Sequence, residues 1–205
     1  IQIIGDVPIY CAMDSVDMYS NKKCFMLDED GIPTYFAGVP GDYFNPDGQI
    51  WGNPLYDWEY MKKDTPAYSF WINRVSFNLE LYDVLRIDHF RGFEACWEVE
   101  FGAEDARGGK WVKAPGEKFF TLLKEKMGND LPLIAEDLGI ITEEVAALRE
   151  SAGLPGMRIL QFAFGGDLNN AYLPHSYDRN TVVYTGTHDN DTTKGWYDNA
   201  PEKEK

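Results

Sequence analysis

Three acidic residues stand where short apolar segments of the chain end. Asp88 closes the segment 84–88, Glu136 closes 131–136, and Asp189 follows shortly after 181–184. Two carboxyl groups that flank a sugar linkage are the usual equipment for cleaving a glycosidic bond. One group must be ionised to attack the sugar, and the other must hold a proton for the leaving oxygen. The chemistry that these residues could perform is therefore glycosidic bond cleavage.

The sequence gives the first two of these groups different surroundings. Arg86 and Asp88 are two residues apart in a segment that alternates like a strand, so both side chains would project from one face. An adjacent guanidinium favours the ionised carboxylate, which suits Asp88 to act as a nucleophile. A purely structural ion pair would explain the same spacing. Glu136 follows apolar residues instead, and burial among them would raise its pKa and help it to hold a proton.

A metal site is the competing use for the acidic and histidine residues near these segment ends. The residues concerned are Asp6, Asp88, His89, Glu136, His188 and Asp189. They contain no His-Glu-x-x-His run and no other compact ligand spacing, so we expect neither a metal nor another cofactor. His188 is expected to donate a hydrogen bond rather than to bind a metal.

The composition is that of a folded, acidic chain. Its 205 residues carry a formal charge of −15 at pH 7, which disfavours nucleic acid as a partner and suits a neutral one. No apolar run approaches the roughly 20 residues of a membrane span, so no membrane partner is expected. Three cysteines without C-x-x-C spacing favour a reducing compartment, which we take to be the cytoplasm. The chain begins inside an apolar run and ends just after a motif, which indicates an internal piece of a longer protein.

Apolar segments alternate with amphipathic ones along much of the chain. Strands are expected at 1–4, 84–88, 131–136, 157–164 and 181–184. Helices are expected after Thr65-Pro66, over 117–127, and from the Thr142 cap to a stop at Gly153. Strands that alternate with helices predict an α/β fold with a parallel sheet.

Two parallel architectures fit this order of elements. A doubly wound, nucleotide-binding sheet is disfavoured because no Gly-x-Gly-x-x-Gly turn opens a helix. In a (β/α)8 barrel the active site lies at the C-terminal ends of the strands, which is where the acidic residues are expected. We therefore predict a partial (β/α)8 TIM-type barrel with about five of the eight strands.

The segment 11–65 interrupts the alternation after the first strand. It shows little periodicity and is dense in Gly, Pro, Asn, Asp and aromatic residues. Loops longer than about 12–15 residues are usually functional or disordered, and so many aromatic residues disfavour disorder. We predict an ordered, inserted loop subdomain that presents Tyr43, Phe44 and Trp51 to a ligand. A minor core that folds the segment on itself would account for some of these aromatic residues.

Five motifs in this chain resemble those of the amylomaltases, which are 4-alpha-glucanotransferases related to the alpha-amylase superfamily. In order, they are Ile-Gly-Asp-Val-Pro-Ile-Tyr at 4–10, Tyr-Phe at 43–44 with Gly-Asn-Pro-Leu-Tyr-Asp-Trp at 52–58, Arg-Ile-Asp-His-Phe-Arg-Gly-Phe at 86–93, Ile-Ala-Glu-Asp-Leu-Gly at 134–139 and Thr-Gly-Thr-His-Asp-Asn-Asp-Thr at 185–192. The resemblance implies that residues 1–205 are a fragment of one catalytic barrel, roughly its third to seventh strands.

The same resemblance implies a role for each matched residue. It implies that Asp88 is the nucleophile, Glu136 the general acid/base and Asp189 the transition-state stabiliser. It also implies that Arg86 and His188 orient these groups and, with the following residues, bind the substrate: Asp6, Tyr10, Asp42, Tyr43, Phe44, Trp51 and His89. The substrate would be a maltodextrin or starch-derived glucan, transferred through a covalent glycosyl-enzyme in a retaining double displacement.

Two other functions fit the same motifs. An alpha-glucan hydrolase would use the same carboxylates and differ only in taking water as the acceptor. A non-catalytic glucan-binding fragment would keep the aromatic residues without the chemistry, although the intact carboxylates disfavour it. The isolated 205-residue chain is expected to be nearly inactive and to self-associate through exposed strand edges.

Overall fold

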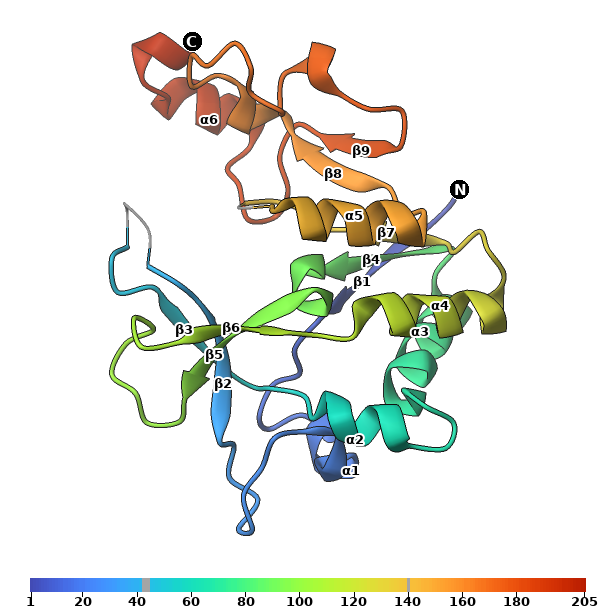
Figure 1. The fold of residues 1–205 in the computed structure, drawn as a ribbon. Coiled ribbons are helices and arrows are strands. Elements are labelled where there is room, and N and C mark those ends of the chain that lie inside the picture. The colour runs from blue at the N-terminus through green and yellow to red at the C-terminus, as the bar shows by residue number, and fades with distance from the viewer. Residues whose placement is uncertain (42–44, 140) are drawn as a thin grey trace.

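The parallel strands form two sheets, a three-stranded sheet in the middle of the molecule and a pair of strands toward the end that carries the C-terminus (Figure 1). The strands β1 (Ile4–Pro8), β4 (Val84–Asp88) and β7 (Leu133–Ala135) form a sheet in the order β1-β4-β7. The strands β8 (Gly156–Ile159) and β9 (Thr181–Tyr184) form a second parallel pair. The computed structural model, which describes residues 1–41, 45–139 and 141–205, thus confirms a mixed α/β fold.

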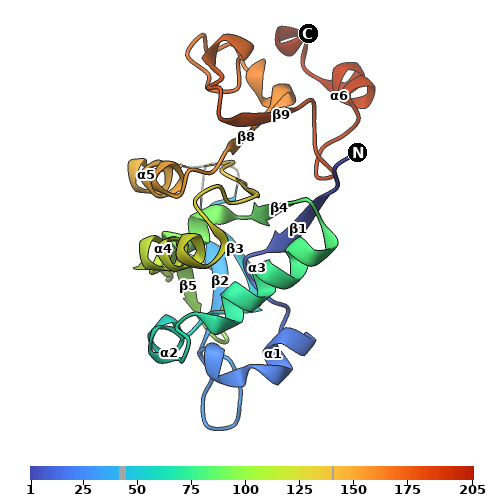
Figure 2. The ribbon, with the colours of Figure 1, turned by 90° about the vertical axis from the view of Figure 1, so that its right-hand side faces the viewer.

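Helices connect these strands and pack on one face of the three-stranded sheet. The helix α3 (Ser69–Leu81) leads into β4, α4 (Gly116–Met127) leads into β7, and α5 (Glu143–Ala152) leads into β8. Gly128 and Gly153 follow α4 and α5 with positive φ, as their positions in the sequence predicted. In the two views of the ribbon, β8, β9 and α6 (Thr193–Asn199) lie at one end and α1 (Val16–Ser20) and α2 (Trp58–Lys63) at the other (Figure 2).

Alternate residues of the parallel strands belong to two different apolar clusters. The main core joins strand residues to the helices and includes Leu85, Ile87, Leu133, Trp71, Phe93 and Phe119. A smaller cluster consists of Ile134, Met157 and Ile159, with Val84, Leu138, Val182 and Tyr184 packed against it. Because successive side chains of a strand point to opposite faces, the two clusters lie on opposite faces of the parallel sheets. The strands β4, β7 and β8 are therefore covered on both faces, which agrees with their near-continuous apolar sequence, whereas alternate residues of β1 are exposed.

The segment 11–65 contributes to an antiparallel sheet that the sequence did not reveal. The sheet has the order β3-β2-β5-β6 and consists of β2 (Tyr35–Val39), β3 (Gln49–Pro54), β5 (Ala95–Glu100) and β6 (Lys110–Lys113). Gly38 resembles a turn residue in the sequence, yet it lies inside β2. A Cβ there would come within 2.4 Å of the Gln49 carbonyl oxygen, so the close approach of β3 requires glycine. Cross-strand contacts of this kind leave no periodic pattern along the chain.

Three predicted boundaries were wrong. The strand predicted over 1–4 runs over Ile4–Pro8, so Asp6 lies inside it rather than after it. The strand predicted over 157–164 ends at Ile159, and the turn of 3-10 helix η3 (Leu160–Ala163) follows it. The helix predicted to start at Thr65-Pro66 begins at Ser69, whose hydroxyl donates to Asp64 at 2.6 Å. Further 3-10 turns are η1 (Lys22–Cys24), η2 (Phe90–Phe93), η4 (Pro174–Ser176) and η5 (Glu202–Glu204). In the ranges described, no helix is long and apolar enough to cross a membrane.

Candidate active site

A buried arginine holds two carboxylates at the C-terminal edge of the three-stranded sheet. The strand register places Arg86 directly beside Asp6. Its Nη1 atom lies 2.5 Å from Asp6 Oδ2, and its Nη2 atom lies 2.7 Å from Asp88 Oδ1. Burial alone would lower the pKa of Arg86, but the two carboxylates raise it above its ordinary value. The guanidinium is buried while both carboxylates remain nearly half exposed, at 45% and 44%, so a ligand can reach them.

Glu136 lies at the end of the neighbouring strand. Ile87 of β4 is the register partner of Ala135 of β7, so the next residues, Asp88 and Glu136, come level with each other. The carboxyl group of Glu136 accepts hydrogen bonds from the backbone N–H groups of His89 at 2.7 Å and Leu138 at 3.0 Å. Burial raises the pKa of Glu136 more than these two hydrogen bonds lower it, and the neighbouring Asp88 raises it further. The direction is the one predicted from the apolar sequence around it.

His89 and two aromatic rings flank the carboxylates. The rings of Trp51 and His89 meet edge to face with their centroids 4.8 Å apart. The Tyr10 ring lies 6.1 Å from Trp51 and 6.2 Å from His89, centroid to centroid. Trp51 is partly exposed, whereas Tyr10 is buried and supports the other two rings. The exposed part of Trp51 is therefore open to a ligand, whereas Tyr10 is covered.

The predicted pair His188 and Asp189 lies on the connection between β9 and α6. His188 Nε2 is 3.5 Å from Asp189 Oδ1, and both side chains are more than 70% exposed. In the described part of the chain, neither side chain is joined to Asp88 or Glu136 by a hydrogen bond or an ion pair. The structure thus brings together Asp6, Tyr10, Trp51, Arg86, Asp88, His89 and Glu136 and leaves His188 and Asp189 on an exposed connection. The remaining predicted residues, Asp42, Tyr43 and Phe44, lie outside the described residues.

Two residues of this neighbourhood were missed in the sequence. The sulfur of Met157 accepts a hydrogen bond from Arg86 Nε at 3.3 Å. Asp137, directly after Glu136, is buried and ion-paired with Arg149 and Arg158. The sequence did carry a signal for Asp137, because two acidic residues stand in a row at the end of an apolar strand. Successive side chains of a strand point to opposite faces, so Glu136 and Asp137 are expected to face different surroundings.

No cation site is evident in the ranges that the structure describes. There, no three His, Cys, Asp or Glu side chains are grouped so that they could hold a metal ion. Cys11, Cys24 and Cys96 are unpaired and buried, and burial raises the pKa of each thiol.

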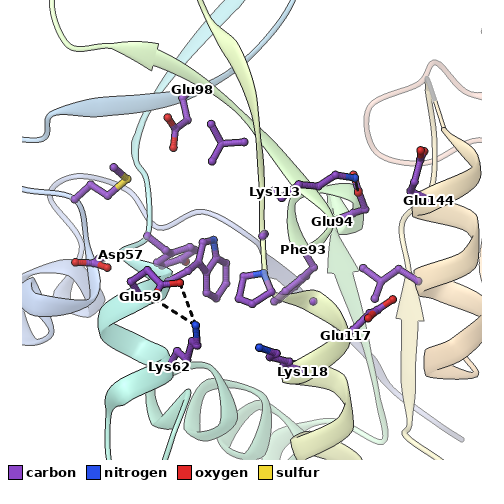
Figure 3. Close-up of a pocket in the computed structure, with 18 of the residues that line it drawn as sticks. Asp57, Glu59, Lys62, Phe93, Glu94, Glu98, Lys113, Glu117, Lys118 and Glu144 are labelled. Carbon is purple, nitrogen blue, oxygen red and sulfur yellow. Dashed lines mark hydrogen bonds and ion pairs between the residues drawn. The ribbon is translucent and has the colours of Figure 1, made fainter.

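A cavity of about 1000 Å³ lies away from these carboxyl groups, between α2, β6, α4 and α5 (Figure 3). The side chains that line it include Trp58, Phe93, Glu98 and Lys118, and none of Asp88, Glu136 and Asp189 does so. Burial raises the pKa of Glu98, and its carboxylate lies 3.6 Å from Lys110. We place the candidate active site at the strand ends because the Asp88–Arg86 pair and the buried Glu136 lie there and none of the three lines this cavity.

The surroundings of His89 give a prediction about pH. Burial lowers the pKa of His89 to about 4, so the imidazole is neutral near pH 7. The unfolded chain binds the same proton at a pKa of about 6.5, so the free energy of unfolding should fall as the pH drops from about 6.5 to 4. An NMR titration should show one of the three imidazoles titrating near pH 4. That signal should be absent from the His89→Asn variant, which is chosen because asparagine tolerates the positive φ of this position. Titration of His89 above pH 6 would contradict its placement.

Comparison with known proteins agrees with the geometry. A family model described as 4-alpha-glucanotransferase, glycoside hydrolase family 77, matches residues 1–205. A 4-alpha-glucanotransferase from Clostridium butyricum is 52% identical over 206 residues, and one from Thermus thermophilus is 54% identical over 207 residues. The solved structure titled amylomaltase from Streptococcus agalactiae in complex with acarbose matches with a TM-score of 0.93 and 45% identity.

Each comparison covers 100% of this chain but only 42%, 41% and 41%, respectively, of those three proteins. The chain therefore spans about two fifths of the length of the relatives that it matches. These matches confirm the resemblance that the five motifs indicated. The chain belongs to the 4-alpha-glucanotransferase family, glycoside hydrolase family 77.

Proposed function

We propose that the protein carrying this chain is a 4-alpha-glucanotransferase that moves alpha-1,4-glucan segments between maltodextrins. The observation that carries the proposal is the side-by-side placement of two different carboxyl groups. Asp88 is held by Arg86, and Glu136 is buried with a raised pKa. Neighbouring strands are about 4.8 Å apart, which is close to the separation of about 5–5.5 Å between the two carboxyl groups of retaining glycosidases.

In the proposed reaction, Asp88 attacks the anomeric carbon while Glu136 gives its proton to the leaving oxygen. A covalent glycosyl-enzyme forms, and the leaving chain departs with the proton. Glu136, now ionised, then takes the proton of an incoming sugar 4-hydroxyl, whose oxygen displaces Asp88. Arg86 holds the Asp88 carboxylate in a fixed direction throughout. Two successive displacements retain the configuration of the sugar.

The remaining residues have proposed roles that rest on the matched motifs. Asp189 would stabilise the transition state with His188 beside it, and the exposure of both leaves them accessible to a ligand. Asp6, Tyr10, His89 and Trp51 would line the sugar site at the strand ends, with the buried Tyr10 behind the rings of His89 and Trp51. The three residues 42–44 would extend the acceptor side. A relative solved in complex with acarbose supports a carbohydrate ligand.

We also propose a larger architecture. The five parallel strands would be the third to seventh of a (β/α)8 barrel, with 11–65 as an inserted subdomain. Two observations support the barrel: helices pack on one face of the strands, and Ile134, Met157 and Ile159 form a separate cluster on the other. Unpaired, buried cysteines support a reducing compartment such as the cytoplasm.

The proposal predicts the products formed from maltotriose by the full-length protein. A transferase should release glucose and at the same time form maltodextrins longer than maltotriose. Asp88→Asn should fold normally and lose turnover on the order of 10³-fold or more, because no other group supplies the nucleophile. Free glucose and maltose without longer products would identify a hydrolase. Binding without any turnover would identify a glucan-binding protein.

Trp51 is predicted to decide between transfer and hydrolysis. The exposed part of its ring offers a surface for the acceptor sugar, and a bound sugar excludes water from the glycosyl-enzyme. Trp51→Ala should raise the ratio of hydrolysis to transfer several-fold, measured as new reducing ends against longer maltodextrins. Trp97→Ala is the matched control, because Trp97 packs on Trp111 in the antiparallel sheet. An unchanged ratio in Trp51→Ala would remove Trp51 from the acceptor site.

The 205-residue chain alone is predicted to self-associate and to be nearly inactive. In the described ranges, β1 pairs only with β4, and β9 pairs only with β8, so each leaves one strand edge open. Ile3, Ile4, Phe77 and Leu81 are exposed, which adds apolar surface. Open edges and apolar surface both favour association. Light scattering should show a dimer or larger species, whereas a monomer that disproportionates maltotriose would contradict the proposed barrel.

A further inference from the structure

Asp137, the acidic residue after Glu136, is buried and held by several partners, although the proposed reaction gives it no role. Asp137 is 5% exposed. Its Oδ1 atom accepts a hydrogen bond from the Met157 N–H at 2.7 Å and lies 3.3 Å from Arg158 Nη1. Its Oδ2 atom lies 3.2 Å from Arg149 Nε. A buried carboxylate is tolerated only where such partners replace its water, so its position is tightly determined.

Asp137 joins two strands that share no ladder. In the described part of the chain, β7 pairs with β4, and β8 pairs with β9. At the boundary between β7 and β8, the Ala135 N–H donates to the Pro155 carbonyl at 2.9 Å, and the next link is the bond from Met157 to Asp137. A Cβ on Gly156 would lie 2.5 Å from Asp137 Oδ2, so the carboxylate is packed directly against the β8 backbone. The side chain of Asp137 thus takes the place of a ladder hydrogen bond.

Met157 extends this link to the other side of the active site. Its backbone donates to Asp137, and its buried sulfur accepts from Arg86 Nε at 3.3 Å. Arg86 in turn holds Asp6 and Asp88. One residue of β8 therefore touches both the arginine that holds Asp88 and the acid that follows Glu136.

We propose that Asp137 is a positioning residue that sets the direction of the Glu136 carboxyl group. The proposal rests on the proposed function, in which Glu136 is the general acid/base. The two residues share a peptide group, so a shift of Asp137 turns the backbone that carries Glu136. The N–H groups of His89 and Leu138 still hold the Glu136 carboxyl group, so the loss should be partial. A misplacement of about 1 Å in a reacting group can cost on the order of 10²-fold in rate.

If Asp137 only stabilises the fold, its substitution should slow every substrate alike. If it positions Glu136, the loss should depend on whether the reaction needs Glu136, so two substrates separate these two roles. Disproportionation of maltotriose needs Glu136 as an acid and then as a base. A maltosyl fluoride with azide as the acceptor needs neither, because fluoride leaves without a proton and azide attacks without losing one. The products are a maltosyl azide and fluoride ion, so fluoride release measures the rate. Both reactions still need Asp88 and Arg86.

The test variant is Asp137→Asn in the full-length protein. Asparagine keeps an oxygen that can accept from Met157 but loses the charge that pairs with Arg149 and Arg158. Turnover of maltotriose should fall by about 10- to 100-fold, while fluoride release with azide should stay close to that of the unchanged protein. Glu136→Gln should show the same split in a more extreme form. Glu150→Gln is the matched control, because Glu150 meets Arg149 on its exposed side at 3.8 Å, and it should change neither rate.

Each other outcome decides against the proposal. An equal fall in both rates would mean that Asp137 only stabilises the fold, and two unchanged rates would mean that it does not position Glu136. If Asp137→Asn does not fold, Arg158→Gln is the second variant, because Arg158 is a partly exposed ion-pair partner of Asp137. It should lower maltotriose turnover more than fluoride release, by a smaller factor than Asp137→Asn. The maltotriose assay on the unchanged protein tests the proposed function separately. If that protein forms no longer maltodextrins, the proposed function is refuted, whatever the Asp137 variants show.

Discussion

The buried guanidinium of Arg86 is the constraint on which the candidate active site depends. Removing a guanidinium from water costs several kcal/mol unless charged partners replace the water, so Arg86 determines what lies around it. Asp6 occupies the neighbouring register position on β1, Asp88 lies two residues further along β4, and the sulfur of Met157 meets the third nitrogen. Three strands therefore meet at one side chain. A change of register by one residue would send Arg86 into the main apolar core, so the register of β1 and β4 is closely specified.

The carboxyl groups of the site differ in their contact with that cation and in their burial. Asp88 and Asp6 contact the guanidinium directly, and both remain open to solvent. Within the described ranges, the Glu136 carboxyl group accepts hydrogen bonds from two backbone N–H groups, and burial raises its pKa more than they lower it. Two acids at the same level of adjacent strands thus have different surroundings. Such a difference is the general way in which one site obtains both an anion and a proton donor.

The sequence predicted the parts of the molecule that repeat a simple pattern. The parallel strands are short apolar runs, and α4 ends at Gly128 as its apolar spacing and its stop residue indicated. The antiparallel sheet was not predicted, because residues such as Gly38 are selected there by the approach of another strand rather than by a period of two. The strand expected to continue to Phe164 ends at Ile159, where Gln161 turns inward and donates to the Asp191 carbonyl at 2.9 Å. The carboxyl groups were found because strand ends can be located from sequence, whereas the link from Asp137 through Met157 to Arg86 joins residues far apart in the chain.

The neutral state of His89 bears on the proposed reaction through the charge around Asp88. Its ring lies next to Trp51, and burial lowers its pKa to about 4, so near pH 7 it adds no positive charge beside Asp6, Asp88 and Arg86. The transition state of glycosyl transfer resembles an oxocarbenium ion and carries positive charge on the sugar. A cationic imidazole at this place would oppose that charge, whereas a neutral one leaves the carboxyl groups of the site to stabilise it.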